Sequence, residues 1–367
     1  MKFPKKYLVI LHFVIVTALI LTGCGGNGTK QSGNIQKTTA NVENSTKVIE
    51  MNVNNITSST HPNTYNVFEP WAKLVEEKTN GRVKVNLYNN GVLGKSQSAL
   101  QDVSGGVYDV GLALPTYFYD TPLFPFTIGN LPFAFPDAKT ASKIIEKFGE
   151  KNVKDGLEDV IIMGIAATDP YDLFSVKPIR KLEDVKGLKM RVQGKGDNEI
   201  IKAWGGVPVS IPLEDSYEAL EKGTLDTQFY TPVGVRGSKA YEVAPYITKI
   251  GIYVTPVIPI MNRNFYNKLP DDLKKLFDEE LNPKLADLLV ESYTKEMEKA
   301  YDEIGKAIKG KGEIITLSPE ELQKFKIPAK IQWDKWVEDA NSKGYPGEQM
   351  MNDFKQMLKD EDITLPF

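Results

Sequence analysis

Residues 187–230 read GLKMRVQGKGDNEIIKAWGGVPVSIPLEDSYEALEKGTLDTQFY, and strand and helix patterns alternate along this stretch. Short apolar runs predict strands at 188–193, 207–211 and 224–230. The intervening segments carry helical spacing and end next to glycine, at 197–204 and 214–222. Strands that alternate with helices favour an α/β fold with largely parallel sheets.

The same alternation extends toward the N-terminus. We expect further strands at 48–53, 83–87, 107–114 and 160–166, and helices around 68–75 and 100–103. Residues 115–136 are crowded with proline and aromatic side chains, which predicts a loop-rich crossover. The last third is predicted to be helical, because an apolar stripe at helical spacing runs from Leu285 to Ile308.

A weak internal repeat links two parts of the chain. Leu100-x-x-Val103-x-x-Gly106-x-x-Asp109 is echoed by Tyr217-x-x-Leu220-x-x-Gly223-x-x-Asp226. The repeat indicates either a common helix-to-strand turn or two similar α/β lobes. Two lobes joined by crossovers would leave a cleft in which a ligand binds.

Composition excludes several classes of function. Lys and Arg number 45 and Asp and Glu 48, a net charge of −3, so we expect no nucleic-acid partner. The single cysteine, Cys24, excludes an internal disulfide and Cys-rich zinc sites. Two histidines, His12 and His61, leave little room for His-based metal or triad chemistry.

The N-terminus has the pattern of an export signal. Residues 1–6 are basic and 7–21 are nearly all apolar, a run too short for a comfortable membrane span. Leu21-Thr22-Gly23-Cys24 resembles the lipobox of bacterial lipoproteins, although an uncleaved anchor helix is the alternative. We therefore expect a signal peptide at 1–23 and lipidation of Cys24.

Residues 25–47 contain almost no apolar side chains, so we interpret 24–47 as a lipidated flexible tether. The predicted location of the folded part is outside the cytoplasm, anchored by lipid to the outer face of the cell membrane.

Enzyme motifs are incomplete in this sequence. Gly94-Lys95-Ser96 resembles the end of a phosphate loop, but the first glycine of that loop is replaced by Asn89. A dinucleotide loop at Gly194-x-Gly196 lacks its third glycine, and no G-x-S-x-G is present. We expect a protein that is not an enzyme and has no cofactor and no metal site.

Arg191 is the strongest candidate for ligand binding. Alternation in the 188–193 strand places Lys189, Arg191 and Gln193 on one side, close to the carboxyl end. In open α/β sheets that end faces the ligand crevice, and Arg matches a carboxylate through a two-pronged hydrogen bond. The alternative is a surface arginine on an edge strand.

Aromatic residues gather in the predicted connections between elements. They are Tyr117, Tyr119, Tyr171, Phe174, Phe229 and Tyr230. Such side chains offer flat, amphipathic cleft walls, although ordinary core filling is the alternative for each of them. We assign Trp204 to the core.

Several segments together resemble the DctP-like solute-binding proteins of tripartite ATP-independent periplasmic (TRAP) transporters. The main ones are 182–192 (LEDVKGLKMRV), 205–212 (GGVPVSIP) and 217–226 (YEALEKGTLD). Shorter ones lie at 79–85, 91–94, 106–111, 131–133 and 269–273. The resemblance covers about residues 48–345 in the expected order.

This resemblance implies two α/β lobes, crossover strands and a long C-terminal helix that together close on an organic acid. The expected two-lobed domain is 48–367. Lobe I comprises about 48–165 plus part of the C-terminal region, and lobe II about 170–260.

The resemblance also implies roles for individual residues. Arg191 matches the arginine that clamps the ligand carboxylate. The other expected cleft residues are Leu213, Gln228, Phe229, Tyr230, Tyr117, Tyr171 and His61.

The sequence departs from relatives that bind sialic acid or C4-dicarboxylates. Those relatives have a second arginine, which is replaced here at about Tyr171. Their Asp-Gly-Gln-Glu-Asn-Pro stretch reads DTQFYTP at 226–232, and their acidic or polar first-lobe residue is replaced near Leu114. Each departure makes the cleft less charged. We therefore expect a monocarboxylate with an apolar or aromatic body.

The sequence thus predicts a membrane-tethered receptor that delivers an organic acid to TRAP membrane subunits. A receptor of an ABC-type or sensory system with the same lobes is one alternative. A secreted enzyme that acts on organic acids is the other, although no base or nucleophile forms a recognisable constellation near Arg191.

Overall fold

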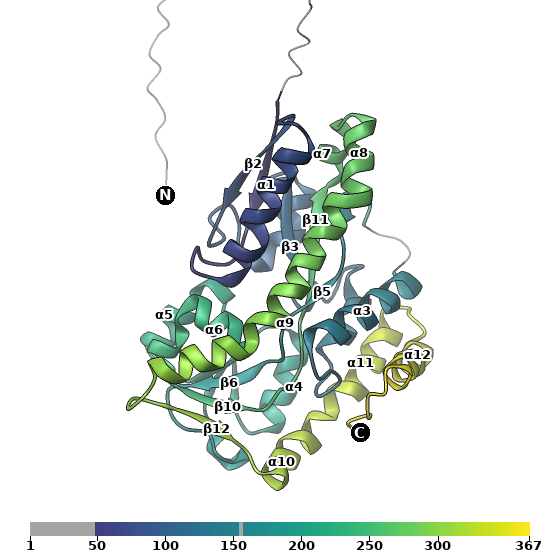
Figure 1. The fold of residues 1–367 in the computed structure, drawn as a ribbon. Coiled ribbons are helices and arrows are strands. Elements are labelled where there is room, and N and C mark those ends of the chain that lie inside the picture. The colour runs from purple at the N-terminus through teal and green to yellow at the C-terminus, as the bar shows by residue number, and fades with distance from the viewer. Residues whose placement is uncertain (1–47, 154–156) are drawn as a thin grey trace, which may run out of the picture. The chain divides into compact units, whose positions relative to one another are not determined.

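The structure, a computed structural model, describes residues 48–153 and 157–367. The predicted signal peptide, Cys24 and tether therefore lie outside the described residues. Two six-stranded sheets organise the fold, with helices packed around them (Figure 1).

The first sheet has the order β2-β1-β3-β11-β4, with β5 paired to β11. Its strands are β1 (Ile49–Asn54), β2 (Val83–Tyr88), β3 (Val110–Ala113), β4 (Val160–Ile162), β5 (Ala166–Ala167) and β11 (Pro256–Asn262). We call this sheet and the elements around it the first lobe.

The second sheet has the order β12-β10-β6-β9-β7-β8 and forms the second lobe. Its strands are β6 (Asp172–Ser175), β7 (Lys189–Val192), β8 (Val207–Ser210), β9 (Thr227–Tyr230), β10 (Tyr246–Lys249) and β12 (Glu313–Thr316). The chain crosses between the lobes after β5 and returns after β10.

Twelve α-helices are assigned within the described residues, besides short 3-10 and π-helical turns. They are α1 (Glu69–Lys78), α2 (Ala99–Ser104), α3 (Ala138–Asn152), α4 (Lys195–Ala203), α5 (Ser216–Glu221), α6 (Pro232–Ser238), α7 (Arg263–Lys268), α8 (Asp271–Leu276), α9 (Asn282–Ala307), α10 (Pro319–Ala329), α11 (Ile331–Ser342) and α12 (Gly347–Asp360). The long helix α9 contacts β5 and α3 on one side and α6 on the other, so it links the two lobes (Figure 1). None of the helices in the described part of the chain has the length and apolar content needed to cross a membrane.

The two copies of the internal repeat lie in two lobes whose strands are arranged alike. In the first, β1 runs parallel to β2 and β3, and β3 pairs antiparallel with β11. In the second, β7 runs parallel to β8 and β9, and β9 pairs antiparallel with β6. The two aspartates play the same role, because Asp109 accepts from the Asn52 amide and Asp226 from the Lys189 amide, each at 2.8 Å.

The sheets are mixed, as expected, but parallel pairing does not predominate. Of the ten strand pairs in the described residues, five are antiparallel. The reason is that β6 and β11 enter each sheet as crossover strands running against their neighbours. The sequence patterns did not reveal β6, β10, β11 or β12.

Candidate ligand-binding cleft

Arg191 lies on β7 and is buried between the lobes, with 1% of its surface exposed. Its Nε donates to the Ile211 carbonyl at 2.9 Å, just past the end of β8. Its Nη2 donates to the Tyr117 hydroxyl at 2.7 Å. Tyr117 ends a short 3-10 turn that follows β3 in the first lobe. One guanidinium therefore contacts groups from both lobes.

The charge of Arg191 has no anionic partner in residues 48–153 and 157–367, where no carboxylate forms an ion pair with it. Both of its hydrogen bonds go to neutral oxygens. A buried charge without a counter-charge is costly, and guanidinium donors are matched to a carboxylate. The arrangement is suited to receiving an anion.

Tyr171 and Tyr230 lie beside this cation. Tyr171 immediately precedes β6, Tyr230 ends β9, and their ring centroids are 6.4 Å apart. Burial raises the pKa of Tyr171 to about 12 and also raises the pKa of Tyr230, while the Arg191 charge acts in the opposite direction on both. Both hydroxyls therefore stay protonated at neutral pH and can donate to a bound anion.

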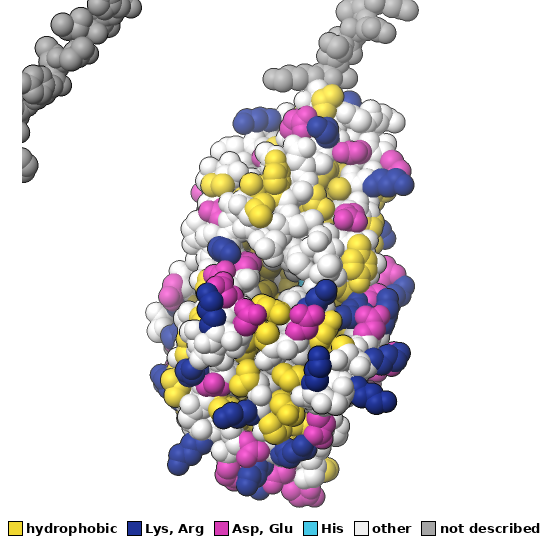
Figure 2. All heavy atoms as spheres, turned by 90° about the vertical axis from the view of Figure 1, so that its left-hand side faces the viewer, with side chains coloured by type: hydrophobic (Ala, Val, Ile, Leu, Met, Phe, Trp, Pro, Cys, Tyr) yellow, Lys and Arg dark blue, Asp and Glu magenta, His cyan; other side chains and the backbone are white. Residues whose placement is uncertain are grey.

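The lobes also touch through other side chains. The Ser96 amide donates to Glu214 Oε1 at 2.8 Å, and Lys95 pairs with Asp215 at 3.1 Å. Elsewhere, the Thr60 hydroxyl donates to the Gly237 carbonyl of α6 at 2.8 Å. These contacts describe a closed arrangement of the two lobes. One face of the molecule is hollowed at mid-height, and charged side chains gather beside the hollow (Figure 2).

Comparison with known proteins identifies this architecture. The family model for bacterial extracellular solute-binding proteins, family 7 (DctP), matches residues 53–339. The chain belongs to this family. The predicted DctP resemblance and the two-lobed α/β fold are therefore confirmed.

One DctP relative is the C4-dicarboxylate-binding periplasmic protein of Rhodobacter capsulatus, 28% identical over 205 residues, which are 55% of this chain and 62% of the relative. A TRAP solute-binding protein of Rhodoferax ferrireducens, in complex with copurified benzoate, has a TM-score of 0.77 at 23% identity. The aligned region covers 86% of this chain and 99% of that one.

A TRAP periplasmic solute-binding protein from Bordetella bronchiseptica, with bound mandelate, has a TM-score of 0.74 at 23% identity over 86% of this chain and 100% of that one. At these identities the two structures establish the fold alone. The chain spans about three-fifths of the length of the first curated relatives that it matches.

Gln228 lies next to Arg191 within the DctP fold. The two residues are in register on β9 and β7, so their side chains share a face of the sheet. The Gln228 side chain is fully buried, and neither of its amide atoms has a hydrogen-bond partner in the described residues. The structure thus brings Gln228 together with Arg191, Tyr117, Tyr171 and Tyr230.

Three other predicted site residues lie differently. Phe229 occupies the opposite face of β9, and its ring packs against Trp204 at 5.5 Å, which makes it a core residue. Leu213 is half-buried in the turn after β8, two residues beyond Ile211. His61 is buried with its ring close to Gly237, and its Nδ1 accepts from the Asn63 amide at 3.0 Å.

Sequence patterns did not single out several polar residues that the fold brings to the site. Gln193 Nε2 donates to the Tyr171 hydroxyl at 3.4 Å, and Thr255 Oγ1 donates to Gln193 Oε1 at 3.4 Å. Ser96 and Glu214 join the lobes beside Arg191. Only the alternation that placed Gln193 on the Arg191 side of its strand gave a signal.

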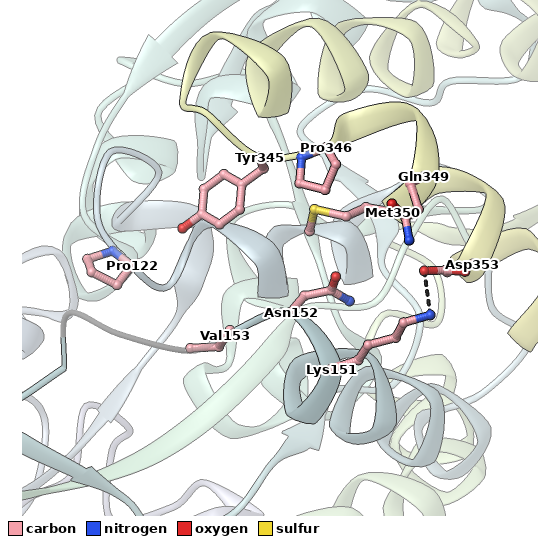
Figure 3. A pocket seen from close by; sticks show the side chains of 9 residues that line it. All are labelled: Pro122, Lys151, Asn152, Val153, Tyr345, Pro346, Gln349, Met350 and Asp353. Atoms are coloured by element: carbon pink, nitrogen blue, oxygen red, sulfur yellow. Dashed lines mark ion pairs between the residues drawn. The ribbon is translucent and has the colours of Figure 1, made fainter.

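A separate pocket of about 410 Å³ lies between the end of α3 and the turn from α11 to α12 (Figure 3). Tyr345, Met350 and Asn152 line it, and Lys151 pairs with Asp353 at its edge at 2.6 Å. It contains none of the predicted site residues. Within the described ranges, no group of three or more His, Cys, Asp or Glu side chains is arranged to hold a metal ion.

Proposed function

We propose that this protein is the extracytoplasmic receptor of a TRAP transporter and binds an organic monocarboxylate at Arg191. The observation that carries the proposal is a buried guanidinium that reaches both lobes and has no anionic partner in the described residues. A ligand carboxylate would supply the missing counter-charge.

The character of the surrounding residues supports a ligand with an apolar or aromatic body. Tyr117, Tyr171 and Tyr230 surround Arg191, so the walls offer flat rings with neutral hydroxyl donors. TRAP solute-binding proteins with the same fold have been found with benzoate and with mandelate, each an aromatic monocarboxylate. These ligands fit the less charged cleft that the sequence predicts.

Capture proceeds by closure in this proposal. The open form exposes Arg191 to water, a carboxylate replaces that water, and the lobes then close over the rest of the ligand. Closure strengthens the ion pair because water is removed from around it. A ligand shifts the balance toward the closed form only through contacts that are tighter there.

Delivery and anchoring complete the proposal. Lipid attached to Cys24 would hold the receptor at the outer face of the membrane, and the closed lobes would be the surface that the transporter's membrane subunits recognise. Mass spectrometry of the protein from membranes tests the first part. A diacylated N-terminal Cys24 is expected, and an intact residue 1–23 segment would contradict it.

A thermal-shift screen of unfolded and refolded protein tests the ligand class. The panel would contain mono- and dicarboxylates, hydroxy and keto acids, aromatic acids, amino acids and sugars. Ligand at 100 times its Kd stabilises a protein by about 2.7 kcal/mol, which is readily detected. We expect shifts confined to monocarboxylates. Shifts with sugars only would overturn the proposal.

A further inference from the structure

Glu214 joins the two lobes through hydrogen bonds from uncharged donors. It lies in the second lobe, in the short turn Leu213–Asp215 that follows β8. Its two carboxylate oxygens accept from the amide and the hydroxyl of Ser96 in the first lobe, at 2.8 and 3.2 Å. Ser96 is fully buried. The Glu214 carboxylate is therefore fixed at a contact between the lobes rather than free in solvent.

The charge of Glu214 is not neutralised by a cation. Among the described residues no Lys, Arg or His forms an ion pair with it, whereas its neighbour Asp215 pairs with Lys95 at 3.1 Å. Both hydrogen bonds to Glu214 come from uncharged donors. A fixed, half-buried and uncompensated negative charge thus remains on this wall.

This negative charge lies close to the anion site but apart from Arg191. Glu214 follows Ile211, whose carbonyl holds Arg191 Nε, by three residues. Beyond the larger effect of burial, the Glu214 charge raises the pKa of both Tyr117 and Tyr230, the tyrosines beside Arg191. The Glu214 carboxylate therefore lies near the cation that would receive an anion.

We propose that Glu214 determines specificity by excluding ligands that carry a second negative charge. The inference rests on the proposed function, because it names the charge state of the acid that Arg191 receives. A second carboxylate roughly 7 Å from Glu214 at an effective dielectric of about 20 would weaken binding by about fiftyfold, and by less where water screens the pair. The uncharged amide of the same shape escapes this penalty.

The test compares pairs of ligands that differ only in charge. The probes are isophthalate with 3-carbamoylbenzoate, and succinate with succinamate. Calorimetry on the full chain, stripped of ligand by refolding, gives Kd for each. We expect at least one monoamide to bind the wild-type protein roughly tenfold or more tighter than its dicarboxylate.

Glu214→Gln keeps an acceptor for the Ser96 amide and removes the charge. In this variant the monoamide-to-dicarboxylate preference should fall by about tenfold. Glu218→Gln is the matched control, because Glu218 is an exposed glutamate on α5 that pairs with Lys222. It should leave the preference unchanged.

Two results would overturn the inference, and they differ from each other. If wild-type protein binds a monoamide and Glu214→Gln weakens all four ligands equally, Glu214 only holds the lobes together, and the proposed function stands. If wild-type protein binds a dicarboxylate as tightly as its monoamide, Glu214 excludes no second charge and the inference fails, whereas the proposed function is decided by the thermal-shift screen.

Discussion

Arg191 is the residue on which the binding account depends. Its guanidinium is buried, donates to two neutral oxygens and has no carboxylate partner in the described part of the chain. Such a cation destabilises the unliganded protein and becomes favourable only when an anion arrives. Arg191 therefore lowers the stability of the unliganded protein but favours binding of an anion.

Replacing Arg191 by Met should weaken binding of the preferred carboxylate by at least about 2 kcal/mol, roughly thirtyfold, because the carboxylate would be buried unpaired. The Tm of the unliganded protein should not fall, since the variant removes an unpaired buried charge. Calorimetry and thermal unfolding measure the two effects. Arg180→Met is the control, because Arg180 pairs with Glu313 at the surface. Unchanged affinity in Arg191→Met would remove Arg191 from the site.

A second single residue, His61, makes the stability of the folded protein depend on pH. Burial, with a smaller effect of Arg236, lowers the pKa of His61 to about 3, below its unfolded value of 6.5. Between these values the unfolded state binds the extra proton, so the stability from neutral His61 is complete above pH 6.5 and falls with decreasing pH. The loss at pH 5 is about 2 kcal/mol.

Urea unfolding at pH 7.5 and at pH 5 checks this expectation, by comparing the loss of stability in wild-type protein with that in His61→Gln. Wild-type protein should lose more stability between the two pH values than His61→Gln, by about 2 kcal/mol. Equal losses in the two proteins would show that His61 titrates normally in the folded state.

At the scale of elements, Gly164 breaks a segment that the sequence predicted as one strand, 160–166. Gly164 has φ +151° and separates β4 from β5. A Cβ built there would lie 2.6 Å from the Cβ of Ala286 on α9. The glycine therefore allows the close approach of the crossover to the long helix.

Gly164→Ala should lower the free energy of unfolding by about 2–4 kcal/mol, because it adds backbone strain and a steric clash. Gly187→Ala separates the two causes, since Gly187 has φ +77° but no atom within 4 Å of a built Cβ. Chemical denaturation should show the smaller loss in Gly187→Ala. Equal losses would mean that contact with α9 contributes nothing.

Elements with local signals could be predicted, and those defined by tertiary contacts could not. Alternation located β1 and β7, and the sequence Ser318-Pro319-Glu320-Glu321 is typical of a helix start, where the Ser318 hydroxyl accepts from the Glu321 amide at the start of α10. In contrast, β11 is buried along its whole length, so its residues show no alternation.

In the candidate site, too, local features could be predicted and contacts between the lobes could not. Arg191 could be predicted because strand alternation and the DctP resemblance both indicate it. Its contact with Tyr117 joins residues 74 positions apart, and the contact of Ser96 with Glu214 spans 118. Neither contact has a local signature, because each depends on how the two lobes meet.

At the scale of the whole molecule, two crossovers and α9 connect lobes that share their strand pattern. Small-angle scattering should show a smaller radius of gyration when the preferred acid is added to the refolded wild-type protein. Arg191→Met at the same acid concentration should not contract. Contraction of both proteins would place the driving contact for closure elsewhere.

A crystal structure of the protein with its tightest-binding acid tests the central claim most directly. The account predicts a single carboxylate with its oxygens about 2.7–2.9 Å from the Arg191 guanidinium, between the two lobes. An acid bound in the pocket of Figure 3, or one whose carboxylate does not touch Arg191, would contradict the account.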